Sequence, residues 1–187
     1  MNQDITLVIT SCNRYDLLAK TLESFYSVNK YPMKEVIVVE DWDREGQVKA
    51  IDKAYARVKT PYIFHCEEDW FFYEGGFIEK SLAILEKYPN ILQVWIREHD
   101  DTNGHPVVKL PQFDCETMQN PWGIWGGFSW NPGLRRLSDY KALGQPYSHF
   151  GQEHLVSKAY SDMGFHAAIT PKGFVYHTGW SRGLPKH

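Results

Sequence analysis

Apolar positions in the first half of the chain alternate between continuous runs and a helical spacing. Four runs are mostly apolar and rich in β-branched or aromatic residues, which predicts buried strands: residues 5–9, 35–39, 62–65 and 91–96. Three intervening stretches carry apolar side chains every three or four residues, which predicts amphipathic helices: residues 18–25, 48–58 and 78–85. Continuous apolar strands that alternate with such helices are typical of a parallel sheet covered on both faces. We therefore expect an α/β fold.

The second half of the chain is less regular, and its elements are predicted from shorter signals. Helices are expected at residues 134–143 and 153–163, short strands at 166–169 and 173–177, and a mobile tail at 178–187. Residues 123–133 are dense in Gly, Trp and Phe. Because the chain contains no internal repeat or linker, we expect a single domain over residues 1–187.

Composition excludes several classes of protein. The 187 residues are 43% hydrophobic and 23% charged, which is typical of a globular domain and excludes wholesale disorder. The net charge of −3 provides no global field for nucleic acid or an anionic membrane. Three cysteines without CxxC spacing argue against a disulfide framework or a zinc cluster. With no secretory signal and no long apolar stretch, a cytoplasmic protein is expected, and peripheral attachment to a membrane is left open.

Polar residues follow the predicted strands at the points where ligands of parallel sheets bind. Three strand ends carry residues 10–14, 40–43 and 67–69, and the second and third of these are acidic. The successive carboxylates of Glu67, Glu68 and Asp69 repel one another unless they are solvated or neutralised by a cation. Carboxylates are the ligands that Mg²⁺ and Mn²⁺ prefer, whereas a solvated acidic turn is the alternative. Their position after a buried strand favours the metal site.

Other candidates have a structural explanation of comparable weight. Asp41 could bind a ribose or a base, or cap the following turn. Thr10, Asn13 and Arg14 suit a nucleotide, but they also suit an ordinary strand-to-helix turn. Glu153 begins a predicted helix, where a carboxylate is either a general base or a favourable partner of the helix dipole.

Two further candidates lie near the C-terminus. His177 follows a short predicted strand, where it could be a metal ligand or a structural histidine. Arg182 could bind phosphate groups, and a solvated basic terminus is the alternative.

Aromatic residues make up 15% of the chain, and this share is high. Trp125, Trp130 and Trp180 could form a platform for a sugar, since the apolar face of a pyranose packs on an aromatic ring. Core packing is the alternative. Because six of the seven Trp lie at predicted strand ends or in irregular segments, the distribution favours a ligand role over core filling alone.

Taken in order, these segments resemble glycosyltransferase family 2. The resemblance is carried by ITLVITSCNR at residues 5–14, EVIVVED at 35–41, YIFHCEEDW at 62–70 and the sequence Gly151-Gln152-Glu153. It implies a GT-A (Rossmann-like) fold, with a mostly parallel central sheet and helices on both faces. It further implies transfer of a sugar from a nucleoside diphosphate sugar with Mn²⁺ or Mg²⁺. Residues 1–97 would form the half that binds the nucleotide sugar, and residues 98–177 the acceptor and catalytic half.

The resemblance also implies roles for individual residues. Glu153 would be the catalytic base, and Asp69 and His177 would be the metal ligands. The nucleotide would be held by Thr10, Asn13, Arg14, Asp41, Glu67, Glu68 and Arg182. Two positions depart from the family pattern: Glu-Glu-Asp replaces Asp-X-Asp, and Glu153 stands where the family usually has Asp.

These observations predict a metal-dependent, inverting hexosyl- or N-acetylhexosaminyltransferase. A UDP-sugar is the favoured donor, because an aspartate near the base suits uracil, and the acceptor is a hydroxyl group on a carbohydrate or another molecule. Two other classes stay open. One is a module that binds sugar nucleotides or carbohydrates without turnover. The other is a nucleotidyltransferase, although the turn at residues 10–14 lacks the glycines expected of its phosphate loop.

Overall fold

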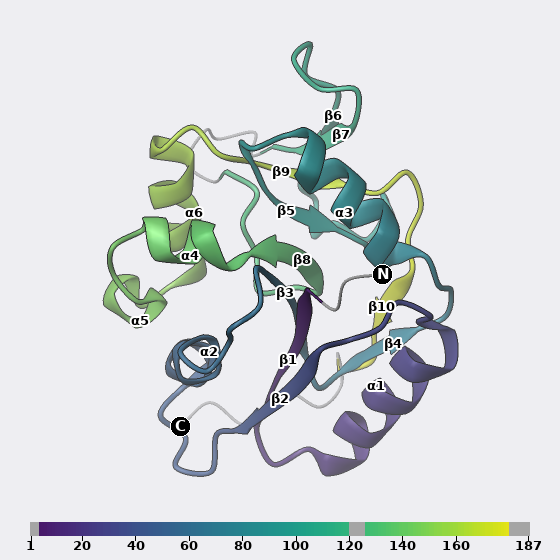
Figure 1. Cartoon of the computed structure of the whole chain (residues 1–187), viewed down its shortest axis with the longest axis vertical. Coiled ribbons are helices and arrows are strands. Elements are labelled where there is room, and N and C mark those ends of the chain that lie inside the picture. The colour runs from purple at the N-terminus through teal and green to yellow at the C-terminus, as the bar shows by residue number, and fades with distance from the viewer. Residues whose placement is uncertain (1–3, 120–125, 180–187) are drawn as a thin grey trace.

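Strand β1 (Ile5–Ser11) lies at the centre of the N-terminal half of the molecule, in parallel register between β2 (Glu35–Glu40) and β3 (Tyr62–Glu67). The computed structural model describes residues 4–119 and 126–179 (Figure 1). Its main sheet has the order β2-β1-β3-β8-β5-β9-β7-β6. The remaining strands of this sheet are β5 (Ile91–Trp95), β6 (Val107–Val108), β7 (Glu116–Met118), β8 (Gly133–Arg136) and β9 (His166–Ile169).

The sheet is mixed because β8 runs antiparallel between β3 and β5. The predicted helix at residues 134–143 is therefore wrong at its start, and helix α4 covers only Leu137–Ala142. Gly133 allows the close approach of β8 to β5, since a Cβ there would lie 2.6 Å from the carbonyl oxygen of Val94. A strand of four residues is too short to be distinguished by its periodicity from the start of a helix.

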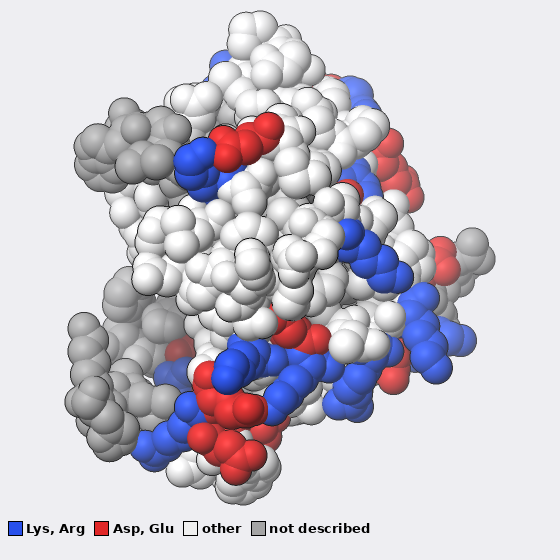
Figure 2. All heavy atoms as spheres, turned by 90° about the vertical axis from the view of Figure 1, so that its left-hand side faces the viewer, with Lys and Arg blue, Asp and Glu red and all other residues white. Residues whose placement is uncertain are grey.

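Helices cover both faces of the sheet, as predicted. Helices α1 (Tyr15–Val28) and α3 (Phe77–Lys87) pack on one face, around a core that includes Phe25 and Phe64. Helices α2 (Gln47–Tyr55), α4, α5 (Tyr147–Phe150) and α6 (Glu153–Asp162) pack on the other face. Figure 2 views this second side, where basic side chains gather over the lower part, with acidic ones among them. The side chains of β1 alternate between the two cores, because successive residues of a strand point to opposite faces.

A second, two-stranded sheet returns the C-terminal part of the chain to the strand ends. Strand β10 (Val175–His177) pairs antiparallel with β4 (Trp70–Phe72), and His177 lies opposite Trp70. The short strand predicted near residue 175 is thus confirmed. No helix among residues 4–119 and 126–179 is long and apolar enough to cross a membrane. Most of the tail predicted at residues 178–187 lies outside the described residues.

Candidate functional site

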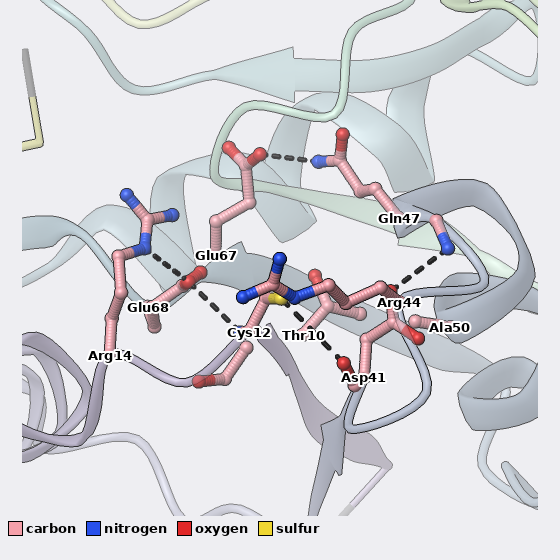
Figure 3. A pocket seen from close by; sticks show the side chains of 11 residues that line it. Thr10, Cys12, Arg14, Asp41, Arg44, Gln47, Ala50, Glu67 and Glu68 are labelled. Atoms are coloured by element: carbon pink, nitrogen blue, oxygen red, sulfur yellow. Dashed lines mark hydrogen bonds and ion pairs between the residues drawn. The ribbon is translucent and has the colours of Figure 1, made fainter. Parts of the chain in front are cut away.

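The carboxyl ends of β1, β2 and β3 enclose a pocket of about 300 Å³ (Figure 3). The strands are parallel, so these ends meet at one edge of the sheet, and α2 completes the wall. Its lining consists of Thr10, Ser11, Cys12, Arg14, Asp41, Arg44, Gly46, Gln47, Ala50, Glu67 and Glu68. The pocket therefore brings together five of the residues assigned to the nucleotide from the sequence: Thr10, Arg14, Asp41, Glu67 and Glu68.

Carboxylates from the neighbouring strands hold the turn that follows β1. The backbone N–H of Cys12 donates to Glu68 Oε1 at 3.1 Å, and that of Asn13 donates to Glu40 Oε1. Asn13 adopts a left-handed conformation with φ of 56°, which asparagine tolerates better than most residues. The exposed Asn13 does not line the pocket, but it shapes the turn that does.

Asp41 acts as a cap in this structure. Its two carboxylate oxygens accept hydrogen bonds from the backbone N–H groups of Glu45 and Gly46, each at 2.9 Å. These bonds fix the turn that leads into α2. The capping role, which is the alternative to nucleotide binding considered from the sequence, is therefore what Asp41 does here. Asp41 still borders the pocket, so its position is compatible with a nearby base.

Arg14 bridges two of the three acidic residues at the end of β3. Its Nε donates to Glu68 Oε1 at 2.7 Å, and its Nη1 lies 2.9 Å from Asp69 Oδ2. Glu68 and Asp69 are 3% and 5% exposed. The solvated acidic turn considered from the sequence is therefore wrong for these two residues. The guanidinium compensates charges that burial would otherwise make costly.

Asp69 also contacts His177, which β10 brings from the far end of the chain. His177 Nε2 lies 3.1 Å from Asp69 Oδ2. The next residue binds the backbone of the same aspartate, because Thr178 donates its N–H and its hydroxyl to the carbonyl oxygen of Asp69. Burial favours the neutral acid, but His177 and Arg14 together lower the pKa of Asp69 below its ordinary value. The carboxylate is therefore kept ionised.

The Asp69–His177 pair fits a divalent cation. Two ligands at about 2.1 Å and a right angle are about 3 Å apart, and the observed separation of the two ligand atoms is 3.1 Å. Asp69 Oδ1 is buried and has no hydrogen-bond partner among the described residues. Within residues 4–119 and 126–179 no cluster of three His, Cys, Asp or Glu side chains is arranged for a metal. Substrate phosphates and water commonly supply the remaining ligands of Mg²⁺.

Glu67 lies between the pocket and this pair. Its carboxylate accepts hydrogen bonds from Gln47 Nε2 and from Trp70 Nε1, the second at 3.3 Å. Burial, followed by the charge of Asp69, raises the pKa of Glu67 to about 8. The charge of Glu153 contributes in the same direction. Because β8 runs antiparallel to β3 with Gly133 opposite His65, the residues that precede Gly133 and bind Glu153 lie toward the carboxyl end of β3.

Glu153 begins α6 and faces an irregular segment that precedes β8. Glu153 Oε2 accepts the backbone N–H of Trp130 at 2.8 Å and the hydroxyl of Ser129 at 3.4 Å. Burial raises the pKa of Glu153 above its ordinary value. A carboxylate with a raised pKa is suited to accept a proton.

The proposed aromatic platform is only partly within the described residues. Trp130 is 7% exposed and packs edge-to-face on Phe128 and Tyr147, so the core-packing alternative describes its ring. Trp125, Trp180 and Arg182 lie outside the described residues. The preference for ligand roles among the tryptophans is also wrong for Trp70, which is 2% exposed.

Sequence reasoning missed Gln47, which binds Glu67 from α2. Gln47 is the first residue of α2 and is exposed, so its polar side chain looks in the sequence like any other surface residue.

Comparisons with known proteins identify the fold. No family model and no curated protein sequence matches the chain. Among solved structures, the chain is similar to the mannosyltransferase PcManGT from Pyrobaculum calidifontis, solved in complex with GDP-Man and Mn²⁺. The TM-score is 0.68 at 14% identity, over 98% of this chain and 59% of that one.

It is also similar to the 1–349 fragment of S. aureus TarS in complex with UDP-GlcNAc, with a TM-score of 0.62 at 13% identity. That match covers 98% of this chain and 60% of the fragment. The chain thus spans about 60% of the length of these structures. Its fold is the GT-A-like α/β fold of nucleotide-sugar glycosyltransferases.

Proposed function

We propose that this chain is a glycosyltransferase that moves a sugar from a nucleoside diphosphate sugar to an acceptor hydroxyl. One observation carries the proposal: Arg14, which lines the pocket formed by β1, β2 and β3, contacts Asp69, and Asp69 contacts His177. Glu153 is bound by the residues just before β8, toward the carboxyl end of β3. The transfer reaction needs a region that binds the diphosphate and a group that accepts the proton of the acceptor hydroxyl. The GT-A-like fold supports the same assignment.

The pocket would take the nucleotide part of the donor. Its volume of about 300 Å³ lies at the lower end of the range for small-molecule sites. Thr10 and Asp41 would surround the base and ribose, and the side of the pocket with Arg14, Glu67 and Glu68 would face the diphosphate. The exposed Trp42 follows Asp41 in the chain and lies 5.6 Å from Tyr15 between ring centroids, and it would offer aromatic surface to the base. We propose a UDP-sugar as the donor and a hexose or an N-acetylhexosamine as the sugar.

Asp69 and His177 would hold Mn²⁺ or Mg²⁺. The chemistry that such an ion supplies when bound is neutralisation of the negative charge on the departing diphosphate. Arg14 is near enough to Asp69 to move from the carboxylate to a phosphate oxygen when the donor binds.

Glu153 would act as the general base. Its carboxylate accepts the proton of the acceptor hydroxyl while the oxygen forms a bond to the anomeric carbon. The bond between that carbon and the diphosphate oxygen breaks at the same time, and the electron pair leaves with the nucleoside diphosphate. Attack from the face opposite the leaving group inverts the anomeric configuration.

Ligand-induced thermal stabilisation tests the donor class without knowledge of the acceptor. UDP-, GDP- and dTDP-sugars are compared with and without Mn²⁺, because specific binding to the folded state raises Tm by mass action. We expect the largest shift with a UDP-sugar and Mn²⁺ together. Release of nucleoside diphosphate then separates the transferase from a nucleotidyltransferase, which would release pyrophosphate. Binding with no release in the presence of a broad acceptor mixture would favour a binding module and contradict the proposal.

A further inference from the structure

The segment that hydrogen-bonds Glu153 is itself held by buried polar side chains. Residues 126–131 form neither helix nor strand, yet side chains of α6, β5 and β8 bind their backbone. Ser157 of α6 accepts the N–H groups of Gly126 and Phe128, and Trp95 Nε1 donates to the carbonyl oxygen of Gly127. This segment therefore has little freedom to move relative to α6.

Gln93 of β5 holds both sides of Trp130. Its side chain is fully buried, and Oε1 accepts the N–H of Ser129 at 3.1 Å. At the other end of the amide, Nε2 donates to the carbonyl oxygen of Asn131 at 3.3 Å. The side chain is accommodated beside Gly133, where a Cβ would lie 3.1 Å from Gln93 Nε2.

Arg135 of β8, the cross-strand partner of Gln93, binds the same two residues. Its Nη2 donates to the carbonyl oxygens of Ser129 and Asn131 at 3.1 and 3.4 Å. The guanidinium is 1% exposed and lies 5.1 Å from the centre of the Phe128 ring. In the described part of the chain no carboxylate forms an ion pair with it. A buried charge without a counterion is costly, so core stability alone is a poor explanation for this residue.

Trp130 transmits this restraint to Glu153. Its N–H lies between the two anchored residues and donates to Glu153 Oε2 at 2.8 Å, and Ser129 Oγ lies 3.4 Å from the same oxygen. Proton transfer is sensitive to a displacement of about 1 Å, so the orientation of this carboxylate matters for a general base.

We propose that Gln93 and Arg135 are positioning residues, which clamp residues 129–131 and thereby orient the Glu153 carboxylate toward the acceptor hydroxyl. The inference rests on the proposed function of Glu153. Neither side chain touches the substrate. Both act through the backbone N–H of Trp130, and the charge of Arg135 also lowers the pKa of Glu153.

The first test separates kcat from KM. Gln93→Met keeps the size of the side chain and removes both hydrogen bonds; we expect kcat to fall roughly 10- to 100-fold with the donor KM unchanged. Arg135→Lys keeps the charge but loses the planar donor group, so it should give a smaller loss than Arg135→Met. Thr117→Val on β7 is the matched control, because it removes a hydrogen bond from a buried side chain to the carbonyl oxygen of Val108 on β6. A Gln93→Met enzyme with wild-type kcat per folded molecule would overturn the proposal.

The second test does not depend on activity. In the wild-type protein the amide NMR signal of Trp130 should follow the titration of Glu153, and Glu153→Gln should abolish that response. We expect Gln93→Met to reduce its amplitude at least twofold. An unchanged amplitude in Gln93→Met contradicts the positioning role, whatever reaction the protein catalyses. A reduced amplitude in a protein that transfers no sugar supports the clamp and rejects the proposed function, so the two failures are distinguishable.

Discussion

Asp69 and His177 lie with Oδ2 and Nε2 3.1 Å apart, although Asp69 directly precedes β4 and His177 ends β10, far along the chain. The antiparallel pairing of β4 with β10 brings His177 to Asp69. These are the two residues that we propose as cation ligands. The proposed chemistry depends on this pairing.

The first prediction concerns the cation. Asp69→Ala should abolish the Mn²⁺-dependent part of UDP binding, and His177→Ala should weaken it about tenfold or more, since each removes one protein ligand. Isothermal titration calorimetry with and without Mn²⁺ measures both. His149→Ala, at an exposed histidine of α5, is the control and should bind as the wild type does. Unchanged UDP affinity in Asp69→Ala would reject the metal role.

The second prediction concerns the general base. Glu153→Gln should lower kcat by about 10²–10⁴-fold, because the amide cannot accept the proton, while donor affinity is retained. Glu79→Gln is the matched control, since Glu79 is an exposed residue in the first turn of α3. Steady-state rates and the thermal shift with donor are measured on the same preparations. Turnover of Glu153→Gln close to wild type would remove Glu153 from the mechanism.

The third prediction concerns the pH dependence of kcat. Burial raises the pKa of Glu153, whereas the hydrogen bonds from Trp130 and Ser129 and the charges of Arg135 and His154 lower it. The charge of Glu153 in turn raises the pKa of Glu67. A base must be deprotonated, so activity should fall on acidification at a pH above the ordinary glutamate pKa of about 4.3.

Ser129→Ala removes one hydrogen bond that favours the charged form, so it should move the acid limb of kcat to higher pH. The profile is recorded at saturating donor and acceptor. An acid limb that stays in place or moves to lower pH would show that the limb belongs to another group.

The fourth prediction concerns Arg14, whose Nη1 lies 2.9 Å from Asp69 Oδ2. Arg14→Gln should lower the free energy of unfolding in a chelator by roughly 2–3 kcal/mol, because two buried carboxylates lose their counterion. Addition of Mn²⁺ should then raise Tm more in the variant than in the wild type, since the guanidinium no longer competes for Asp69.

Arg136→Gln is the control for this experiment. Arg136 also forms a partly buried ion pair, with Asp139 at 3.0 Å, but it lies away from Asp69. The Arg136→Gln variant should have a lower free energy of unfolding than the wild type in the chelator. Mn²⁺ should raise its Tm by no more than it raises that of the wild type. Equal Mn²⁺ responses in Arg14→Gln and the wild type would contradict competition for Asp69.

The fifth prediction concerns stability at low pH. His65 of β3 is fully buried, packs on Tyr55 of α2, and has no hydrogen-bond partner for its ring nitrogens among the described residues. Burial, reinforced by the charge of Arg135 on β8, lowers the pKa of His65 well below its ordinary value. The unfolded chain therefore binds a proton that the folded chain does not. Below pH of about 6.5 this costs up to about 1.4 kcal/mol of stability per pH unit.

His65→Leu removes that contribution and should flatten the loss of stability between about pH 6.5 and pH 5. Burial also lowers the pKa of His105 and of His166, so a smaller acid sensitivity of the same sign should persist. Urea unfolding at several pH values measures the difference between the two proteins. Parallel curves for the variant and the wild type would mean that His65 is protonated in the folded state.

The sequence alone was sufficient for the N-terminal half of the fold and for the location of the pocket. Continuous apolar runs and helical spacing are local signals, and they predicted β1, β2, β3 and α1 within a few residues. Parallel strands end at the same edge of a sheet, so the sequence predicts that Thr10, Asp41 and Glu67 lie close together. All three line the pocket.

Only the tertiary structure decided the contacts that give these residues their surroundings. The insertion of β8 between β3 and β5, the contact of His177 with Asp69 and the capture of Arg14 by two carboxylates all join distant segments. Trp130 is a further example of what the sequence does not determine. Its position in an irregular segment predicted a platform for a sugar, whereas its contact with Tyr147 places its ring in the hydrophobic core. Periodicity in the sequence indicates which face of a helix or strand is apolar. The order of the strands and the partners of each side chain depend on packing between elements that are distant in sequence, and a local pattern carries no information about that packing.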